Sequence, residues 1–360
     1  MDHEMASEQR DVEMNGTRDV HPIEVPTFFQ AGPETLFGIL TQPSASTAAN
    51  GTAVMILAGG ATPVTTNRNR LSVRLCRGVA SLGFHAFRLD YHGAGESTGM
   101  VKQLRLNQPF DEDAEGGLVW MQERGIEDFV LVGSCFGSRV ALAEAAANDR
   151  VRRLVLVAAP SRDAVMGNRG IARTADEWST WRFMRRALHP HILRGWFDAN
   201  RRRLYRRYAR EKWRAIMRLA RHRFARSNTD DPPWISSQFL EQFRTVVDRG
   251  VRILLLYGES DSFYTDFRRA LDGTLGTIIE EAGDQIETRV LPGQIHGFTQ
   301  LSVQDAVLQE ILDWLGPATE ESIPAPIEAE DRSGSADLMV AVDEIAPSSP
   351  SGVPGKGYAG

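Results

Sequence analysis

Residues 129–142 read FVLVGSCFGSRVAL and decide the fold of this chain. The first four residues form an apolar run typical of a buried strand, and the last residues begin an apolar helix. Gly133 and Gly137 lie two residues on either side of Cys135. Glycine there removes Cβ atoms that would collide with the neighbouring strand and helix when the central residue is strained. The pattern predicts a sharp strand-to-helix turn that presents Cys135 at a helix N-terminus, where a thiolate is favoured.

Two other nucleophiles lie in the same stretch. Ser134 and Ser138 carry hydroxyl groups, but neither has a glycine two residues away on both sides. The competing interpretation of the motif is that Cys135 is a small buried residue and that the glycines merely form a turn.

Outward from this turn, short apolar runs alternate with segments of helical pattern. Two of the runs, 54–57 and 253–256, are continuously apolar, as in parallel strands covered on both faces. The alternation predicts an α/β fold with a mostly parallel sheet. The expected strands are 23–29, 36–41, 53–57, 85–89, 129–132, 154–158, 253–257 and 287–291. The expected helices are 70–82, 112–124, 136–148, 262–272 and 303–315.

The alternation stops between residues 163 and 243, where the pattern is only helical and rich in arginine and aromatic residues. Residues 162–226 hold 19 basic and 5 acidic side chains, a net charge of +14, whereas the rest of the chain carries −20. This asymmetry predicts an anionic substrate or partner. The alternative is that the basic segment only neutralises the acidic body.

The Gly133-x-Cys135-x-Gly137 turn resembles the nucleophile elbow of the α/β-hydrolases, with cysteine where serine is usual. The resemblance covers residues 23–315 and implies an α/β-hydrolase fold. In that family the acid and the histidine follow the nucleophile along the chain. The basic segment 163–243 lies after the sixth core strand, where the family places a helical cap.

The same resemblance implies the remaining catalytic residues. Residues 258–261 follow a predicted strand and match the acid turn, and residues 292–298 follow the last strand and match the histidine loop. Asp261 would orient His296, and His296 would deprotonate Cys135 and then protonate the leaving group. Glu259 and Asp266 remain as alternative acids.

Two upstream turns extend the resemblance. The turn at 57–61 matches the position of an oxyanion donor, so the backbone N–H groups of Phe136 and of either Gly60 or Ala61 are the expected oxyanion hole. Residues 90–97, DYHGAGES, resemble a structural turn of the family. Tyr91 and His92 are therefore expected to line the substrate pocket without a catalytic role.

Composition predicts which other segments are folded and which kinds of site the chain can form. Residues 1–20 and 317–360 have the polar, Pro-, Ser- and acid-rich composition of disordered tails, which leaves a core of residues 21–162 and 244–316 around the cap at 163–243. Two cysteines exclude a disulfide framework and a cysteine-rich zinc site. The sequence lacks an 18-residue apolar window and a signal-peptide pattern, so we expect a cytoplasmic protein without cofactor or metal.

The resemblance narrows the function to acyl chemistry. The chain is similar to cysteine-dependent dienelactone hydrolases and thioesterases, and residues 59–99 also resemble hydrolases associated with exopolysaccharide export. This implies a Cys-His-Asp enzyme acting on an ester or thioester by hydrolysis or acyl transfer, in secondary-metabolite (polyketide) biosynthesis. One alternative is a lyase that eliminates acetate from an acetylated tetronate-type polyketide intermediate, and another is a non-catalytic binding module. The expected partners are an anionic acyl substrate and an acidic carrier protein, not nucleic acid or membrane.

Overall fold

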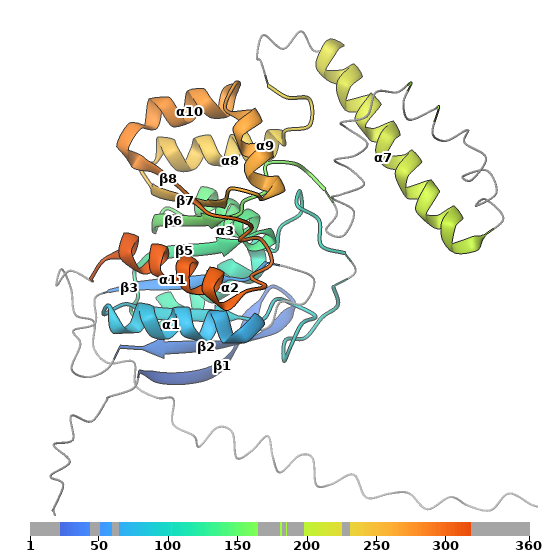
Figure 1. Ribbon diagram of the computed structural model, residues 1–360. Coiled ribbons are helices and arrows are strands. Elements are labelled where there is room, and N and C mark those ends of the chain that lie inside the picture. The colour runs from blue at the N-terminus through green and yellow to red at the C-terminus, as the bar shows by residue number, and fades with distance from the viewer. Residues whose placement is uncertain are drawn as a thin grey trace, which may run out of the picture. The chain divides into compact units, whose positions relative to one another are not determined.

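The computed structural model describes residues 22–43, 51–59, 65–101, 103–164, 181, 185, 198–224 and 231–317. Within these ranges the chain forms one eight-stranded sheet with helices on both faces (Figure 1). The predicted α/β class is confirmed.

The sheet is mostly parallel, with the strand order β1-β2-β4-β3-β5-β6-β7-β8. Only β2 runs against its neighbours, pairing antiparallel with β1 and β4, while each pair from β4 through β8 is parallel. The strands are β1 (Ile23–Ala31), β2 (Glu34–Gln42), β3 (Thr52–Leu57), β4 (His85–Leu89), β5 (Asp128–Ser134), β6 (Val151–Val157), β7 (Arg252–Gly258) and β8 (Ile286–Leu291).

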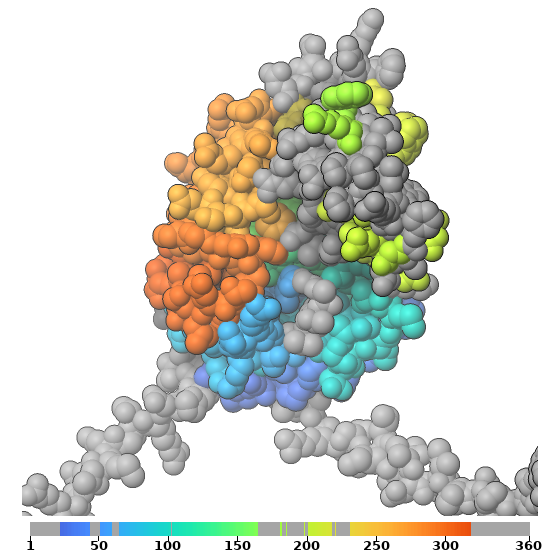
Figure 2. All heavy atoms as spheres, turned by 45° about the vertical axis from the view of Figure 1, so that its right-hand side comes forward, coloured from blue at the N-terminus to red at the C-terminus, as the bar shows by residue number. Residues whose placement is uncertain are grey.

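Helices cover both faces of the sheet. On one face α1 (Leu71–Ser81) packs against α11 (Leu301–Leu315), and the two form adjoining parts of the surface in Figure 2. On the other face α2 (Asp111–Gln122), α3 (Phe136–Ala147) and α8 (Ser237–Asp248) pack in a row, with α3 against β5 and β6. The remaining helices are α7 (Ala199–Phe224), α9 (Ser262–Ala270), α10 (Thr274–Ala282) and the single turns η1 (Arg68–Arg70) and η2 (Gly283–Gln285).

All eight predicted strands are present, and the one at 85–89 has the predicted bounds. Helix α10 was not predicted, because its first turn contains the loop-like residues Thr274 and Gly276. Its start is fixed from far away in the chain, since Asp231 accepts hydrogen bonds from the backbone N–H of Thr274 (2.7 Å) and from its hydroxyl (2.6 Å). Helix α8 begins at Ser237, so the predicted end of the insert at residue 243 falls inside this helix.

The central strands are buried on both faces, which is why their sequences are continuous apolar runs. Leu131 of β5, Leu154 of β6 and Leu254 of β7 are 0% exposed. Because β3 to β8 are parallel, their carboxyl ends lie along one edge of the sheet, and ligands of open α/β sheets bind at that edge.

The described part of the insert is dominated by α7, which confirms helical structure there. The helix contains 11 basic residues and one acid, Glu211. Among the α7 side chains that the structure describes, seven arginines are exposed: Arg201, Arg202, Arg203, Arg206, Arg207, Arg210 and Arg214. Among the described helices, none has both the length and the apolar composition needed to cross a membrane.

Candidate active site

The strand–turn–helix predicted from residues 129–142 is present. Cys135 lies between β5 and α3 with φ +52° and ψ −110°, in a region that non-glycine residues rarely adopt. The strained residue is held at both ends, because its N–H donates to the carbonyl of Val157 (2.9 Å) and its carbonyl accepts from the N–H of Ser138 (3.1 Å). The turn places Cys135 at the N-terminal end of α3.

Close backbone contacts explain the glycines of this turn. A Cβ atom at Gly133 would lie 2.3 Å from the carbonyl oxygen of Gly137, and one at Gly137 would lie 2.0 Å from that of Leu57. At Gly59, which follows β3, a Cβ would lie 1.9 Å from the carbonyl oxygen of Ser134. The end of β3 therefore packs directly on the turn, and this contact leaves no room for a side chain.

We expect Gly137→Ala to lower the free energy of unfolding by about 3 kcal/mol or more, because the added methyl group must displace backbone. Urea denaturation measures this loss. Gly125→Ala is the control for backbone strain without a clash, since Gly125 has a positive φ (+82°) and open space around it, whereas Gly137 lies in α3. Its cost is limited to backbone strain, about 1–2 kcal/mol. Equal losses in the two variants would contradict the close packing at the turn.

The two neighbouring serines serve the backbone of the turn. The Ser138 hydroxyl is buried and donates to the carbonyl of Gly133 (2.8 Å), with the carbonyl of Val157 at 3.1 Å. The Ser134 hydroxyl accepts the N–H of Gly59 (3.1 Å). These contacts favour Cys135 as the nucleophile of the turn.

The acid and histidine loops are joined by hydrogen bonds. Asp261, at the start of α9, is 0% exposed, and its carboxylate accepts the backbone N–H groups of Gly258 (3.2 Å), Ile295 (3.3 Å) and His296 (3.1 Å). The N–H of Ser260 donates to the carbonyl of Gly293 (2.8 Å). The structure thus brings Asp261 and the backbone of His296 together, as the sequence predicted.

The histidine loop also reaches the nucleophile turn. The ring of Phe263 on α9 packs edge-on against the ring of His296, with centroids 4.8 Å apart, and the Nδ1 atom of His296 is buried. Phe298, two residues later, lines a small cavity of about 30 Å³ together with Ser134 and Val157. The ends of β5 and β6 and the loop after β8 therefore meet at one place.

The two alternative acids have other surroundings. Asp266 on α9 forms a buried, bidentate ion pair with Arg162 (2.7 and 2.9 Å). Glu259 is exposed, and its N–H donates to the carbonyl of Leu291 (2.8 Å). Only Asp261 of the three contacts the backbone of His296 in the hydrogen bonds that the structure describes.

Tyr91 lies beside the residue that follows Cys135, and His92 packs against Phe110. The Tyr91 ring packs edge-on against Phe136 (6.1 Å between centroids), and Tyr91 is buried, which raises its pKa well above the ordinary value. The His92 side chain is 26% exposed, and its Nδ1 lies 2.9 Å from Asp113 on α2. Tyr91 is thus a core residue, while His92 is held at the surface by a buried carboxylate that the sequence analysis missed.

The predicted oxyanion donors are described in part. Phe136 is the first residue of α3, and the first N–H groups of a helix have no partner within the helix. Gly60 and Ala61 lie outside the described residues. Across the described ranges, no group of three or more His, Cys, Asp or Glu side chains has the arrangement of a metal site.

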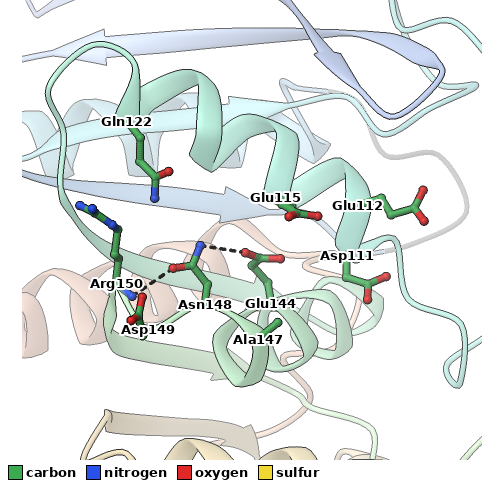
Figure 3. A pocket seen from close by; sticks show the side chains of 9 residues that line it. All are labelled: Asp111, Glu112, Glu115, Gln122, Glu144, Ala147, Asn148, Asp149 and Arg150. Atoms are coloured by element: carbon green, nitrogen blue, oxygen red, sulfur yellow. Dashed lines mark hydrogen bonds between the residues drawn. The ribbon is translucent and has the colours of Figure 1, made fainter.

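A second hollow, of about 300 Å³, lies between α2 and the end of α3 (Figure 3). It contains none of the residues described above, and five carboxylates line it: Asp111, Glu112, Glu115, Glu144 and Asp149. Burial, reinforced by the charges of Glu115 and Asp111, raises the pKa of Glu144 to about 7, and Asn148 donates to its carboxyl group (3.2 Å).

This carboxyl group makes stability depend on pH. The raised pKa of Glu144 means that the folded protein favours the protonated carboxyl group. Protonation therefore stabilises the fold at low pH, and this stabilisation is lost as the pH rises from about 4.5 to about 7. We expect Glu144→Gln to keep the hydrogen bond from Asn148. The wild type is expected to lose up to about 3 kcal/mol of its free energy of unfolding over this pH range, and the variant is not. Urea denaturation at pH 5 and pH 8 tests this, and an equal pH dependence in variant and wild type would contradict it.

Comparison with known proteins assigns the family. The model of the alpha/beta hydrolase family matches residues 58–308, more than half of the chain. The chain belongs to the alpha/beta hydrolase family. The match spans the elbow, the insert and the loops of Asp261 and His296 in this α/β hydrolase. A search of curated proteins finds no match.

Solved structures similar to this chain include serine hydrolases and esterases. A Xanthomonas campestris α/β serine hydrolase without a lid is 15% identical, with 82% of this chain and 96% of that chain covered and a TM-score of 0.44. The Pyrococcus furiosus esterase Pf2001 is 13% identical, with 82% and 92% covered and a TM-score of 0.49. A Bacillus coagulans carboxyl esterase is 16% identical, with 81% and 97% covered and a TM-score of 0.46. At these scores the neighbours carry no argument about the reaction of this α/β hydrolase.

Proposed function

We propose that this α/β hydrolase is a Cys-His-Asp enzyme that takes an acyl group from an ester or thioester onto Cys135. One observation carries the proposal: Cys135 occupies the strained turn at the N-terminus of α3, and the tight contacts of Gly59, Gly133 and Gly137 maintain it. A helix N-terminus favours the thiolate form of a cysteine at this position.

The proposed reaction has two steps. In the first, His296 takes the thiol proton, Cys135 Sγ attacks the acyl carbonyl, and the same proton passes to the departing alcohol or thiol. The backbone N–H of Phe136 is the oxyanion donor from α3, with a second donor in the turn after Gly59. In the second step, water or another acceptor gives a proton to His296 and attacks the acyl thioester, and the Cys135 thiolate leaves and is reprotonated. Asp261 orients His296 in both steps.

The cysteine bears on the substrate class. A thiolate is both a good nucleophile and a good leaving group, so esters and thioesters suit it better than unactivated amides. We therefore place esterase, thioesterase and acyltransferase activity ahead of peptidase activity. The resemblance to thioesterases of polyketide pathways leads us to assign the reaction to a biosynthetic pathway.

The charge of the insert supports an anionic reactant. Seven exposed arginines on α7 present positive charge to solvent, while the rest of the chain is acidic. Such a surface attracts an acyl substrate that carries a negative charge, or an acidic protein that carries the acyl group.

Product analysis tests the reaction type. The enzyme is incubated with a panel of acyl esters and acyl thioesters, and the products are identified by mass spectrometry. Release of an acid and an alcohol or thiol supports the proposal, as does transfer of the acyl group to an added nucleophile. An alkene with free acetate from an acetylated substrate would indicate a lyase, and binding without turnover would indicate a binding module; either outcome overturns the proposal.

A further inference from the structure

Two segments form a stem at the base of the insert. Residues 159–164 leave the sheet after β6, and residues 231–236 return before α8. They pair through an antiparallel bridge between Arg162 and Ile235, and the N–H of Ser236 donates to the carbonyl of Ser161 (2.9 Å). The stem is thus the covalent connection between the insert and the α/β core.

A buried arginine joins the stem to the helix of the nucleophile. Arg139 lies on α3, four residues after Cys135, and is 0% exposed. Its guanidinium donates to the carbonyl of Pro160 (3.4 Å), to the carboxylate of Asp163 (3.3 Å) and to the hydroxyl of Ser236 (3.2 Å). One side chain therefore contacts both segments of the stem.

A second buried arginine joins the stem to the helix of the acid. Arg162, within the stem, forms the bidentate ion pair with Asp266 on α9, and Asp261 begins this helix. The guanidinium of Arg162 also stacks on the ring of Trp234 in the returning segment, 4.0 Å from its centroid. The stem is thus fixed to two of the three elements that carry the proposed triad.

We propose that Arg139 is a positioning residue that couples the stem of the insert to the nucleophile turn. Removing a guanidinium from water is costly, and an apolar side chain would fill the same space without that cost. Burial lowers the pKa of Arg139, in keeping with this cost, and the neighbouring carboxylate of Asp163 offsets part of it. The guanidinium adds direction, because its planar donors hold Pro160, Asp163 and Ser236 in a defined arrangement around the end of one side chain.

The coupling has a consequence for catalysis, and this part rests on the proposed function. Arg139 holds α3 against the stem, and Cys135 and the N–H of Phe136 lie at the start of this helix. Loss of Arg139 is therefore expected to lower turnover more than it weakens substrate binding.

Arg249, the residue that follows α8, provides a control at the other end of α3. It donates to the backbone carbonyls of Ala145 (2.7 Å) and Asn148 (2.6 Å) at the other end of α3, and no described contact joins it to the stem. Arg139→Met and Arg249→Met each remove one guanidinium group, from contacts at opposite ends of α3.

Hydrogen exchange of the full-length protein tests the coupling without any substrate. In Arg139→Met we expect amide exchange to rise about tenfold both in 136–142 and in the stem segments, whereas in Arg249→Met it rises only near 143–148. Wild-type protection of 136–142 in Arg139→Met overturns the proposal. Because the measurement needs no substrate, it tests the coupling even if the proposed acyl chemistry is wrong.

Kinetics test the consequence for catalysis. For Arg139→Met we expect kcat for a p-nitrophenyl ester to fall about tenfold, with KM within twofold of the wild type. For Arg249→Met we expect wild-type kcat once the folded fraction is taken into account. An equal loss of kcat in the two variants would reduce Arg139 to a residue of general stability and overturn the proposal. If the wild type fails to turn over the ester, the proposed function fails and hydrogen exchange decides the role of Arg139.

Discussion

Cys135→Ala is expected to lower kcat/KM for an acyl ester by about 10³-fold or more, because no other group in the turn replaces the thiolate as nucleophile. Ser134 and Ser138 are the nearest hydroxyls, and both are engaged with the backbone. Alanine keeps the Cβ and the positive φ of the native residue, so folding is expected to be close to that of the wild type. Steady-state kinetics with a chromogenic ester, beside a thermal melt, separates the loss of chemistry from a loss of structure.

Cys76→Ala is the control for this experiment. Cys76 on α1 is fully buried, and burial raises the pKa of its thiol to about 11. The thiol is therefore protonated at neutral pH and does not act as a nucleophile. Its variant is expected to keep wild-type kcat. A loss of activity in Cys76→Ala with retention in Cys135→Ala would show that the wrong cysteine has been assigned.

Asp261→Asn is expected to lower kcat by about 10³–10⁴-fold, since the amide cannot stabilise the imidazolium form of His296. The buried carboxylate also accepts three backbone N–H groups, and an amide NH₂ placed against these donors leaves at least one unsatisfied. We therefore expect an additional loss of about 1–3 kcal/mol in the free energy of unfolding. The kinetic loss is measured on the folded fraction, with stability measured by urea denaturation.

Glu259→Gln is the matched control for the acid. Glu259 lies two residues before Asp261 but is exposed, and only its backbone N–H takes part in the loop. Its variant is expected to retain both activity and stability. Wild-type kcat in Asp261→Asn, together with a large loss in Glu259→Gln, would reverse the assignment of the acid.

Local sequence was enough to predict the sheet and the nucleophile turn. Continuous apolar runs mark strands covered on both faces. The glycines two residues before and after Cys135 mark the turn, in which Cys135 has a φ of +52° and close backbone contacts leave no space for side chains at the glycine positions. The pairing of Asp261 with His296 was implied by the resemblance to the α/β-hydrolases, and the structure brings the two loops together at the ends of the neighbouring parallel strands β7 and β8.

The connections that need distant partners were not predictable. Arg139 stood in the motif, yet its contacts with Asp163 and Ser236 depend on how the insert leaves and re-enters the core. Asp113, which holds His92 from 21 residues away, had no local signal either. Tyr91 was expected to line the pocket, and the structure places it in the core against Phe136 because its ring completes an aromatic cluster there.

The most direct test of the central claim is intact-protein mass spectrometry after brief exposure to an activated acyl ester, followed by peptide mapping. We expect one acyl group per chain, located on Cys135 and absent from Cys135→Ala. Full turnover by a wild-type enzyme whose Cys135 remains unmodified under rapid acid quench, or acylation that persists in Cys135→Ala, would contradict it.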